Sequence, residues 1–175
     1  MVISVGRLIN NGGMMKKIIV IGCPGSGKST FSRELHKKTN IPLYHLDMLF
    51  WNADKTTVEK SVFLQRLKEL LDKDEWILDG NFNSTMELRM SSCDTVIFLD
   101  FSPEICLDGV RARRGKPRFD MPWIETEEDD EFMDYIRNFN EQRRPQILEL
   151  LEKFKDKNII RFTTREEMDE YLKAY

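Results

Sequence analysis

The feature that most constrains this chain is the stretch at residues 22–30, which reads GCPGSGKST and fits the pattern G-x-x-x-x-G-K-[ST] without a mismatch. The β-branched apolar run at residues 18–21 is typical of a buried parallel strand, and residues 30–37 predict a helix with Phe31 and Leu35 on one face. A glycine-rich turn from strand to helix points successive N–H groups at one anion. The stretch therefore predicts a nucleoside triphosphate site rather than a turn that binds nothing.

The chemistry of this loop predicts a role for each of its residues. Lys28 is expected to reach the β- and γ-phosphates, and the Ser29 hydroxyl is expected to hold Mg²⁺. The residues expected to cradle the nucleotide are Gly22, Pro24, Gly25, Ser26, Gly27, Lys28, Ser29 and Thr30. The predicted cofactors are therefore a nucleoside triphosphate, ATP in the kinase interpretation below, and Mg²⁺.

Composition limits the other classes of function. With 175 residues, 41% of them apolar, the chain is expected to form one domain with a substantial core. A net charge of −3 favours neither nucleic acid nor a membrane surface as a partner, and no apolar run approaches the length of a membrane span. The three cysteines are scattered, which predicts buried thiols in a reducing compartment and a cytoplasmic protein.

The first residues read differently from the rest of the chain. An apolar stretch too short for a secretory signal leads into N-N-G-G, and M-M-K-K at residues 14–17 resembles a natural chain start. We expect residues 1–14 to be a loosely ordered N-terminal extension and residues 15–175 to be a single domain.

Four further runs read as strands, at residues 43–46, 76–79, 95–99 and 159–162. Helical patterns alternate with them, including an amphipathic helix at residues 58–71 and a capping box at residues 164–167. Alternation of this kind predicts an α/β fold, with a five-stranded parallel sheet covered by helices on both faces.

Carboxylates follow three of these strands, where ligands sit in open α/β sheets. Asp47 is expected to contact the phosphate acceptor as a base or orienting group, with a helix cap as the alternative. Asp79 is our candidate for the carboxylate behind Mg²⁺, with Asp100 left as an alternative. Residues 48–51, M-L-F-W, are either a helical turn packed on the core or an aromatic wall of the acceptor site, made by Phe50 and Trp51.

A basic cluster at residues 111–118, R-A-R-R-G-K-P-R, lies between two helical patterns. It fits a lid at about residues 115–125 that closes over a triphosphate better than it fits a nucleic-acid patch, because the chain is acidic overall. Arg111 and Arg114 are expected to flank the base or reach the phosphates, and Arg118 is expected to close with the lid. Further along, Arg137 and Arg144 are candidates for neutralising charge on the transferred group.

Missing motifs narrow the class of phosphate-loop protein. The chain lacks the N-K-x-D sequence of guanine-specific GTPases. Gly80 follows Asp79 and Phe101 follows Asp100, so no acidic residue stands beside either carboxylate to activate water. This favours phosphate transfer to a bound acceptor over hydrolysis.

The chain from residue 15 onward resembles the adenylate kinase-like group of P-loop small-molecule kinases. Within that group it is most similar to the branch called DNA topology modulation proteins, through H-L-D at 45–47, W-I-L-D-G-N-F at 76–82, L-R at 88–89, D-T-V-I-F-L-D-F at 94–101 and R-R-P at 143–145. The resemblance implies a P-loop NTPase fold with a short arginine-rich lid, a donor site at the phosphate loop and an acceptor site near Asp47.

Two departures from adenylate kinases affect the acceptor. Phe50 stands where those enzymes have an arginine that clamps the acceptor phosphate, and the sequence N-F-N follows Gly80 where they have a proline-arginine pair after their own D-G-F. Arg89 and Arg137 are the candidate replacements.

Together these features predict an ATP-binding phosphotransferase that moves the γ-phosphate of ATP-Mg to a small acceptor, such as a nucleotide or a nucleoside. The alternative is a nucleotide-binding regulatory module that affects DNA topology with little or no kinase turnover. Steep dependence of DNA binding on salt would favour the alternative.

Overall fold

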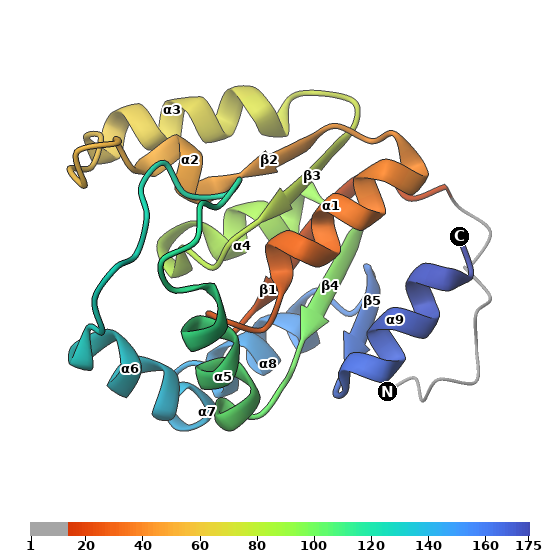
Figure 1. Ribbon diagram of the computed structural model, residues 1–175. Helices are drawn as coiled ribbons and strands as arrows, with labels where there is room; N and C mark the ends of the chain where they lie inside the picture. The colour runs from red at the N-terminus through yellow and green to blue at the C-terminus, as the bar shows by residue number, and fades with distance from the viewer. Residues whose placement is uncertain (1–13) are drawn as a thin grey trace.

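A computed structural model of the chain describes residues 14–175. Its sheet has five parallel strands in the order β2-β3-β1-β4-β5 (Figure 1). The strands are β1 (Lys17–Gly22), β2 (Leu43–His45), β3 (Trp76–Asp79), β4 (Thr95–Leu99) and β5 (Asn158–Phe162). The predicted parallel sheet is confirmed, but β2 ends at His45, so Asp47 lies in the short helix that follows and not directly at a strand end.

The central strands are buried because helices cover both faces of the sheet. Ile18 and Ile21 of β1 have no exposed surface, and neither do Val96 and Leu99 of β4. β1 pairs with both neighbours, Ile18 with Ile77 of β3 and with Thr95 of β4. A continuous run of branched apolar residues is the composition that such a doubly covered strand requires.

Helices α1 (Lys28–Thr39) and α9 (Arg165–Lys173) lie on one face of the sheet, and α4 (Asn83–Ser92) and α8 (Arg144–Lys153) lie on the other (Figure 1). The remaining helices are α2 (Leu46–Phe50), α3 (Lys60–Leu71), α5 (Pro103–Arg113), α6 (Asp130–Arg137) and α7 (Phe139–Gln142). The arrangement confirms the predicted helical cover on both faces.

Two helices begin later than the sequence pattern suggests. α3 begins at Lys60 and not at Val58, where the sequence pattern begins. The acidic stretch that starts at Glu125 becomes helical only at Asp130, where α6 begins, and the Asp129 carboxylate caps α6 by accepting a hydrogen bond from the Phe132 N–H at 3.1 Å. The capping box of α9 forms as predicted, with Thr164 and Glu167 bonding each other's backbone.

The predicted N-terminal extension lies outside the described residues except for Met14, so its loose order stays a prediction, as does the single-domain assignment. Within residues 14–175, none of the helices has the length and apolar character that a membrane crossing requires.

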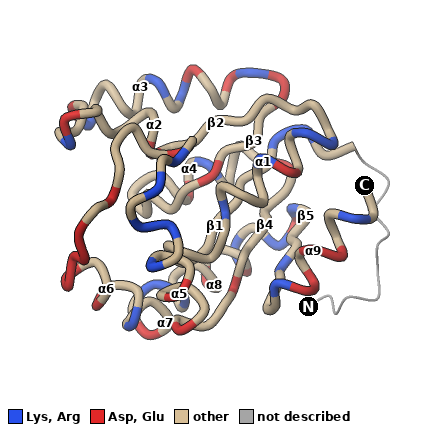
Figure 2. The backbone as a smooth tube through the Cα atoms, viewed as in Figure 1, with Lys and Arg blue, Asp and Glu red and all other residues tan. Residues whose placement is uncertain are grey.

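All five strands run in the same direction, so their carboxyl ends meet at one edge of the sheet. Residues 114–129, called the lid segment below, join α5 to α6 without helix or strand and pass over this edge (Figure 1). Figure 2 shows basic residues gathered near the start of this segment and acidic residues toward α6. The lid segment therefore covers the place where β1 ends and the phosphate loop begins.

Candidate functional site

The phosphate loop is interlocked with α5. Gly25 and Gly27 have φ values of +84° and +97°, in the left-handed region that glycine tolerates best. A Cβ on Gly25 would lie 2.0 Å from the carbonyl oxygen of Cys106, and a Cβ on Gly109 would lie 2.1 Å from the carbonyl oxygen of Gly25. The shape of the loop therefore depends on two glycines that face each other across the contact with α5.

Gly109→Ala is expected to weaken nucleotide binding about 10-fold or more, because the new methyl group pushes the Gly25 carbonyl and displaces the phosphate cradle. Alanine in a helix interior is ordinarily about 1 kcal/mol more favourable than glycine, so helix propensity alone predicts a more stable protein with no loss of nucleotide affinity. Calorimetric titration with ATP-Mg checks the change. Asp108→Ala, one residue earlier on an exposed face of α5, should leave affinity unchanged, and equal affinities in the two variants would contradict the interlock.

The two loop residues with predicted chemical roles are both engaged with neighbours. Lys28 Nζ donates hydrogen bonds to the carbonyl oxygens of Gly22 and Cys23, at 2.9 and 3.1 Å. Burial lowers the pKa of Lys28, and the nearby carboxylates of Asp79 and Asp47 oppose that shift. The Ser29 hydroxyl donates to Asp120 of the lid segment at 2.5 Å.

One cavity of about 1190 Å³ lies between the phosphate loop, the strand ends and the lid segment. It brings together most of the predicted site residues, namely Pro24, Gly25, Gly27, Lys28, Ser29, Thr30, Asp47, Asp79, Arg114 and Arg118. Gly22 and Ser26 are buried within the loop. Trp51 also lines the cavity.

Three of the predicted arginines lie away from the lining of this cavity. Arg111 is half exposed and lies 3.7 Å from Asp108 on the same helix. Arg137 pairs with Asp134, and Arg144 donates to Asp100 at 2.8 Å. Their predicted roles in nucleotide binding and transfer therefore have no support from these positions and stay predictions.

The two candidate metal carboxylates have different surroundings. Asp79 lines the cavity, and His45 Nδ1 lies 2.9 Å from both of its carboxylate oxygens. Burial alone would lower the pKa of His45, but the hydrogen bond and charge of Asp79 raise it above its usual value. Asp100 is engaged by Arg144 and by Arg161, whose Nε donates at 2.7 Å. These positions favour Asp79 over Asp100 as a carboxylate near Mg²⁺.

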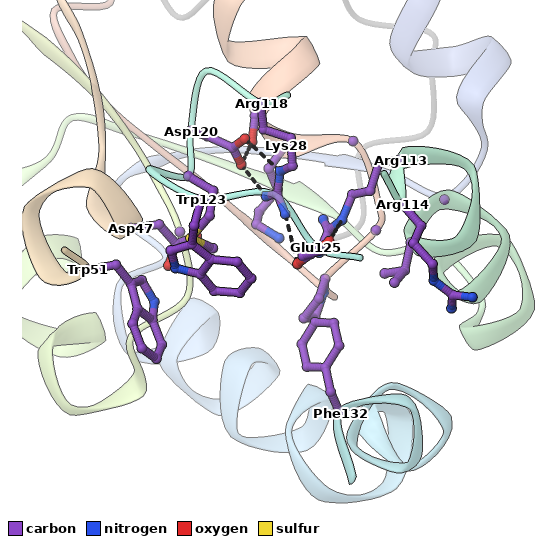
Figure 3. Close-up of a pocket in the computed structure, with 18 of the residues that line it drawn as sticks. Lys28, Asp47, Trp51, Arg113, Arg114, Arg118, Asp120, Trp123, Glu125 and Phe132 are labelled. Carbon is purple, nitrogen blue, oxygen red and sulfur yellow. Dashed lines mark hydrogen bonds and ion pairs between the residues drawn. The ribbon is translucent and has the colours of Figure 1, made fainter. Parts of the chain in front are cut away.

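Asp47 faces the cavity across from the phosphate loop (Figure 3). Burial raises its pKa to about 6, with Asp120 and Asp79 adding to the rise while Lys28 and Arg118 oppose it. A carboxylate with this pKa changes charge close to neutral pH, which suits proton transfer better than an ordinary aspartate does.

Arg113 at the end of α5 and Arg118 of the lid segment both form ion pairs with acidic residues of the lid segment. Arg118 makes a two-pronged contact with Asp120, at 2.9 and 2.6 Å, and also donates to Glu125 at 3.0 Å. Arg113 makes a second two-pronged contact with Glu125, at 2.9 and 3.0 Å (Figure 3). These pairs fix the arginine side chains over the cavity, where their charge can act on a bound phosphate.

Aromatic rings form the wall around Asp47. Trp51 meets Trp123 of the lid segment edge to face, with ring centroids 5.9 Å apart. Phe50 instead packs between Phe63 and Phe82, 5.5 and 5.1 Å away. Phe50 therefore packs on the core, as the first alternative has it, and Trp51 lines the cavity, while a role for Trp51 in holding an acceptor stays a prediction.

Arg89, a candidate clamp for an acceptor phosphate, is wholly buried. Its guanidinium donates to the carbonyl oxygens of Gly80 and Phe82, at 3.0 and 3.3 Å, and to that of Asn81. Burial lowers its pKa to about 9. Arg89 therefore fixes the turn after β3, from which the Asn81 side chain reaches the Gly22 N–H at 3.2 Å.

Several lining residues were not predicted from the sequence. The main ones are Arg33, Lys55, Asp120, Trp123 and Arg165. Asp120 could have been suspected from the sequence, because it follows Arg118 by two residues within the predicted lid. The sequence pattern does not, however, predict its hydrogen bond with Ser29, 91 positions away. Arg165 opens α9 and approaches the loop carbonyls of Gly25 and Ser26 at 3.5 Å, a contact that depends on the sheet order.

Comparisons with known proteins agree with this geometry. The adenylate kinase of Thermotoga neapolitana is 29% identical over 92 residues, which cover 51% of this chain and 41% of that protein. The shikimate kinase of Bacteroides thetaiotaomicron is 25% identical over 148 residues, 75% of this chain and 81% of that protein. The chain thus spans about two fifths of the length of the adenylate kinases that it matches.

The solved structure of shikimate kinase from Acinetobacter baumannii in complex with shikimate has a TM-score of 0.63 and 15% identity, and covers 92% of this chain and 90% of that one. The likeness confirms the predicted α/β P-loop NTPase fold. A family model described as an AAA domain matches residues 18–134, from β1 through the phosphate loop and the lid segment into α6. Because this match takes in most of the chain and nearly every residue that lines the cavity, the chain belongs to that AAA domain family.

Proposed function

We propose that this protein is an ATP- and Mg²⁺-dependent phosphotransferase that acts on a small acceptor bearing a hydroxyl group. The observation that carries the proposal is that one cavity of about 1190 Å³ is lined both by Lys28 and Ser29 of the phosphate loop and by Asp47. Pockets for one small ligand measure about 300–1,000 Å³, so this cavity has room for a donor and an acceptor together. The similarity to adenylate kinase and shikimate kinase supports the same class of reaction.

A hydroxyl acceptor is proposed because two positions considered for a phosphate clamp do not supply one. Phe50 packs among aromatic rings, and Arg89 is fully used by the turn after β3. Trp51, Phe82 and Trp123 suit the planar or apolar body of a nucleoside-like molecule. Because Lys55 lies 5.2 Å from the centre of the Trp123 ring and Arg33 lines the same cavity, a phosphate-bearing acceptor is the competing class, which the screen below separates.

In the proposed reaction, the acceptor oxygen attacks the γ-phosphorus of ATP while the bond to the β–γ bridging oxygen breaks. ADP leaves, the acceptor becomes a phosphate monoester, and its hydroxyl proton passes to Asp47. Lys28, Arg113 and Arg118 face the same cavity and would stabilise the charge that spreads over the transferred group. Mg²⁺, held through Ser29 and supported by Asp79, would supply further neutralisation of the phosphate charge.

A transfer screen tests this function. Purified protein with ATP-Mg²⁺ is assayed against nucleosides, small alcohols and nucleoside monophosphates, with ADP and phosphorylated product both measured. We expect product from a hydroxyl-bearing acceptor in amounts equal to the ADP formed. ADP and free phosphate formed without acceptor dependence would indicate a hydrolase, and preferential transfer to AMP would contradict the acceptor class.

Membership in the branch of DNA topology modulation proteins, and the alternative of a regulatory module with little turnover, stay predictions. The described residues offer no observation that favours the regulatory module over the enzyme.

A further inference from the structure

A hydrogen bond joins the lid segment to the phosphate loop, from the Ser29 hydroxyl to the Asp120 carboxylate. From this contact we propose that Asp120 is an acidic residue of the divalent-cation site, and that it couples cation binding to closure of the lid segment. The proposal rests on nucleotide binding at the phosphate loop and adds a residue to the proposed site. Nothing in the loop motif itself specifies a carboxylate from the lid.

Asp120 is placed as firmly as a core residue. Its relative exposure is 7%, although the neighbouring Phe119 is 75% exposed. One carboxylate oxygen lies 2.5 Å from Ser29 Oγ, and Arg118 grips both oxygens from the opposite side. The pair with Arg118 and the hydrogen bond from Ser29 therefore hold the carboxylate in place beside the loop hydroxyl.

The donor set around Ser29 fits Mg²⁺. This ion prefers oxygen ligands, keeps several waters, and is usually bound through one or two carboxylates together with substrate phosphates. Ser29 offers the hydroxyl, while Asp79 from β3 and Asp120 from the lid segment line the same cavity. Among residues 14–175, no group of three or more His, Cys, Asp or Glu side chains is placed to hold a metal ion by itself, so phosphate and water oxygens would have to complete the shell.

Asp120 should lower the affinity for the nucleotide when no cation is present and raise it when Mg²⁺ is present. Without a cation, the carboxylate faces the like charge of an incoming triphosphate and opposes its binding. With Mg²⁺ present, the same carboxylate attracts the cation and supports the ternary complex. A residue that only blocks the loop would oppose the nucleotide under both conditions, so the two roles are separable.

The experiment measures the dissociation constant of a non-hydrolysable ATP analogue, first in EDTA and then in saturating Mg²⁺, for the wild type and for Asp120→Asn. For the variant we expect about 3-fold tighter binding in EDTA and about 10-fold weaker binding in Mg²⁺. The affinity of Mn²⁺ for the analogue complex, read by electron paramagnetic resonance, should fall by a similar factor. These readouts need neither turnover nor a known acceptor.

Two further variants keep the test decisive. Asp130→Asn removes an exposed carboxylate directly after the lid segment that does not line the cavity, and it should leave the ratio of the two dissociation constants as in the wild type. Asp120→Glu keeps the charge and should retain most of the Mg²⁺ dependence, so loss of that dependence in this variant would contradict the cation role. If Asp120→Asn does not fold, retention of the Mg²⁺ dependence by Asp120→Glu and its loss in Asp120→Ser decide the question.

The outcomes also separate this proposal from the proposed function. Equal tightening of nucleotide binding by Asp120→Asn in EDTA and in Mg²⁺ would identify Asp120 as a block and overturn the cation role. The cation role would also be overturned if Asp120→Asn left both dissociation constants unchanged. A wild type that binds the analogue with Mg²⁺ dependence but transfers no phosphate would overturn the phosphotransferase while leaving the role of Asp120 standing.

Discussion

Replacing Lys28 with methionine is expected to lower phosphate transfer by about 100- to 1,000-fold, the scale of losing one donor aimed at charge that develops in the transition state. Nucleotide affinity should fall at least about 10-fold. The fold should survive, because methionine fills nearly the same volume and the ammonium group it replaces is costly to bury, as the lowered pKa of Lys28 indicates. Calorimetric titration and thermal unfolding of the same sample separate loss of function from loss of structure.

Lys37→Met is the matched control for this substitution. Lys37 lies on the same helix, pairs with Glu34 and keeps 66% of its side chain exposed, so nucleotide affinity should not change. If Lys28→Met bound ATP-Mg²⁺ as tightly as the wild type, the donor site could not lie at the phosphate loop, and the proposed function would lose its basis.

The parts of the structure that the sequence predicts well depend on local patterns. The loop motif and the branched apolar runs specify a buried strand, a turn and a helix within a few residues of one another, and β1, β3 and β4 form where expected. The capping box at Thr164 is equally local. Helix α4 gives a weaker signal, because Thr85 and Arg89 are buried polar residues on its inner side and interrupt the apolar stripe.

The parts that the sequence does not predict depend on pairing across long distances. Arg89 resembles a candidate phosphate clamp in sequence, and only the fold shows that it is used by the turn after β3. In the sequence, Asp120 is one of several carboxylates of the lid segment, and only the fold places it next to Ser29. Trp51 and Phe50 are neighbours in sequence, yet Trp51 lines the cavity and Phe50 packs on the core, because α2 ends at Phe50 and the chain is extended at Trp51.

Asp47→Asn is expected to make the protein more stable and less active at once. Asp47 has a pKa of about 6 in the folded chain, whereas an aspartate in an unfolded chain has a pKa of about 3.9. As pH rises from about 4 to 6, the unfolded chain therefore loses this proton first, and the free energy of unfolding falls. Above about pH 6 the folded protein carries the full cost of the buried charge, about 2–3 kcal/mol at 1.36 kcal/mol for each pKa unit.

Asparagine lacks that cost, so Asp47→Asn should raise the free energy of unfolding by up to this amount at pH 7–8, and its advantage should shrink toward zero near pH 4. Urea unfolding at both pH values checks the sign, with the exposed Asp169→Asn of α9 as the control expected to show no such trend. Phosphate transfer should fall about 100- to 10,000-fold, as on loss of a general base. A variant that gains no stability at pH 7–8 would show that Asp47 is not held at a cost, and a variant that keeps full turnover would exclude Asp47 as the proton acceptor. Both results together would leave Asp47 as an acidic residue in the first turn of α2, since His45 and not Asp47 is the N-cap of that helix. Higher stability with lost transfer is what a carboxylate retained for catalysis predicts.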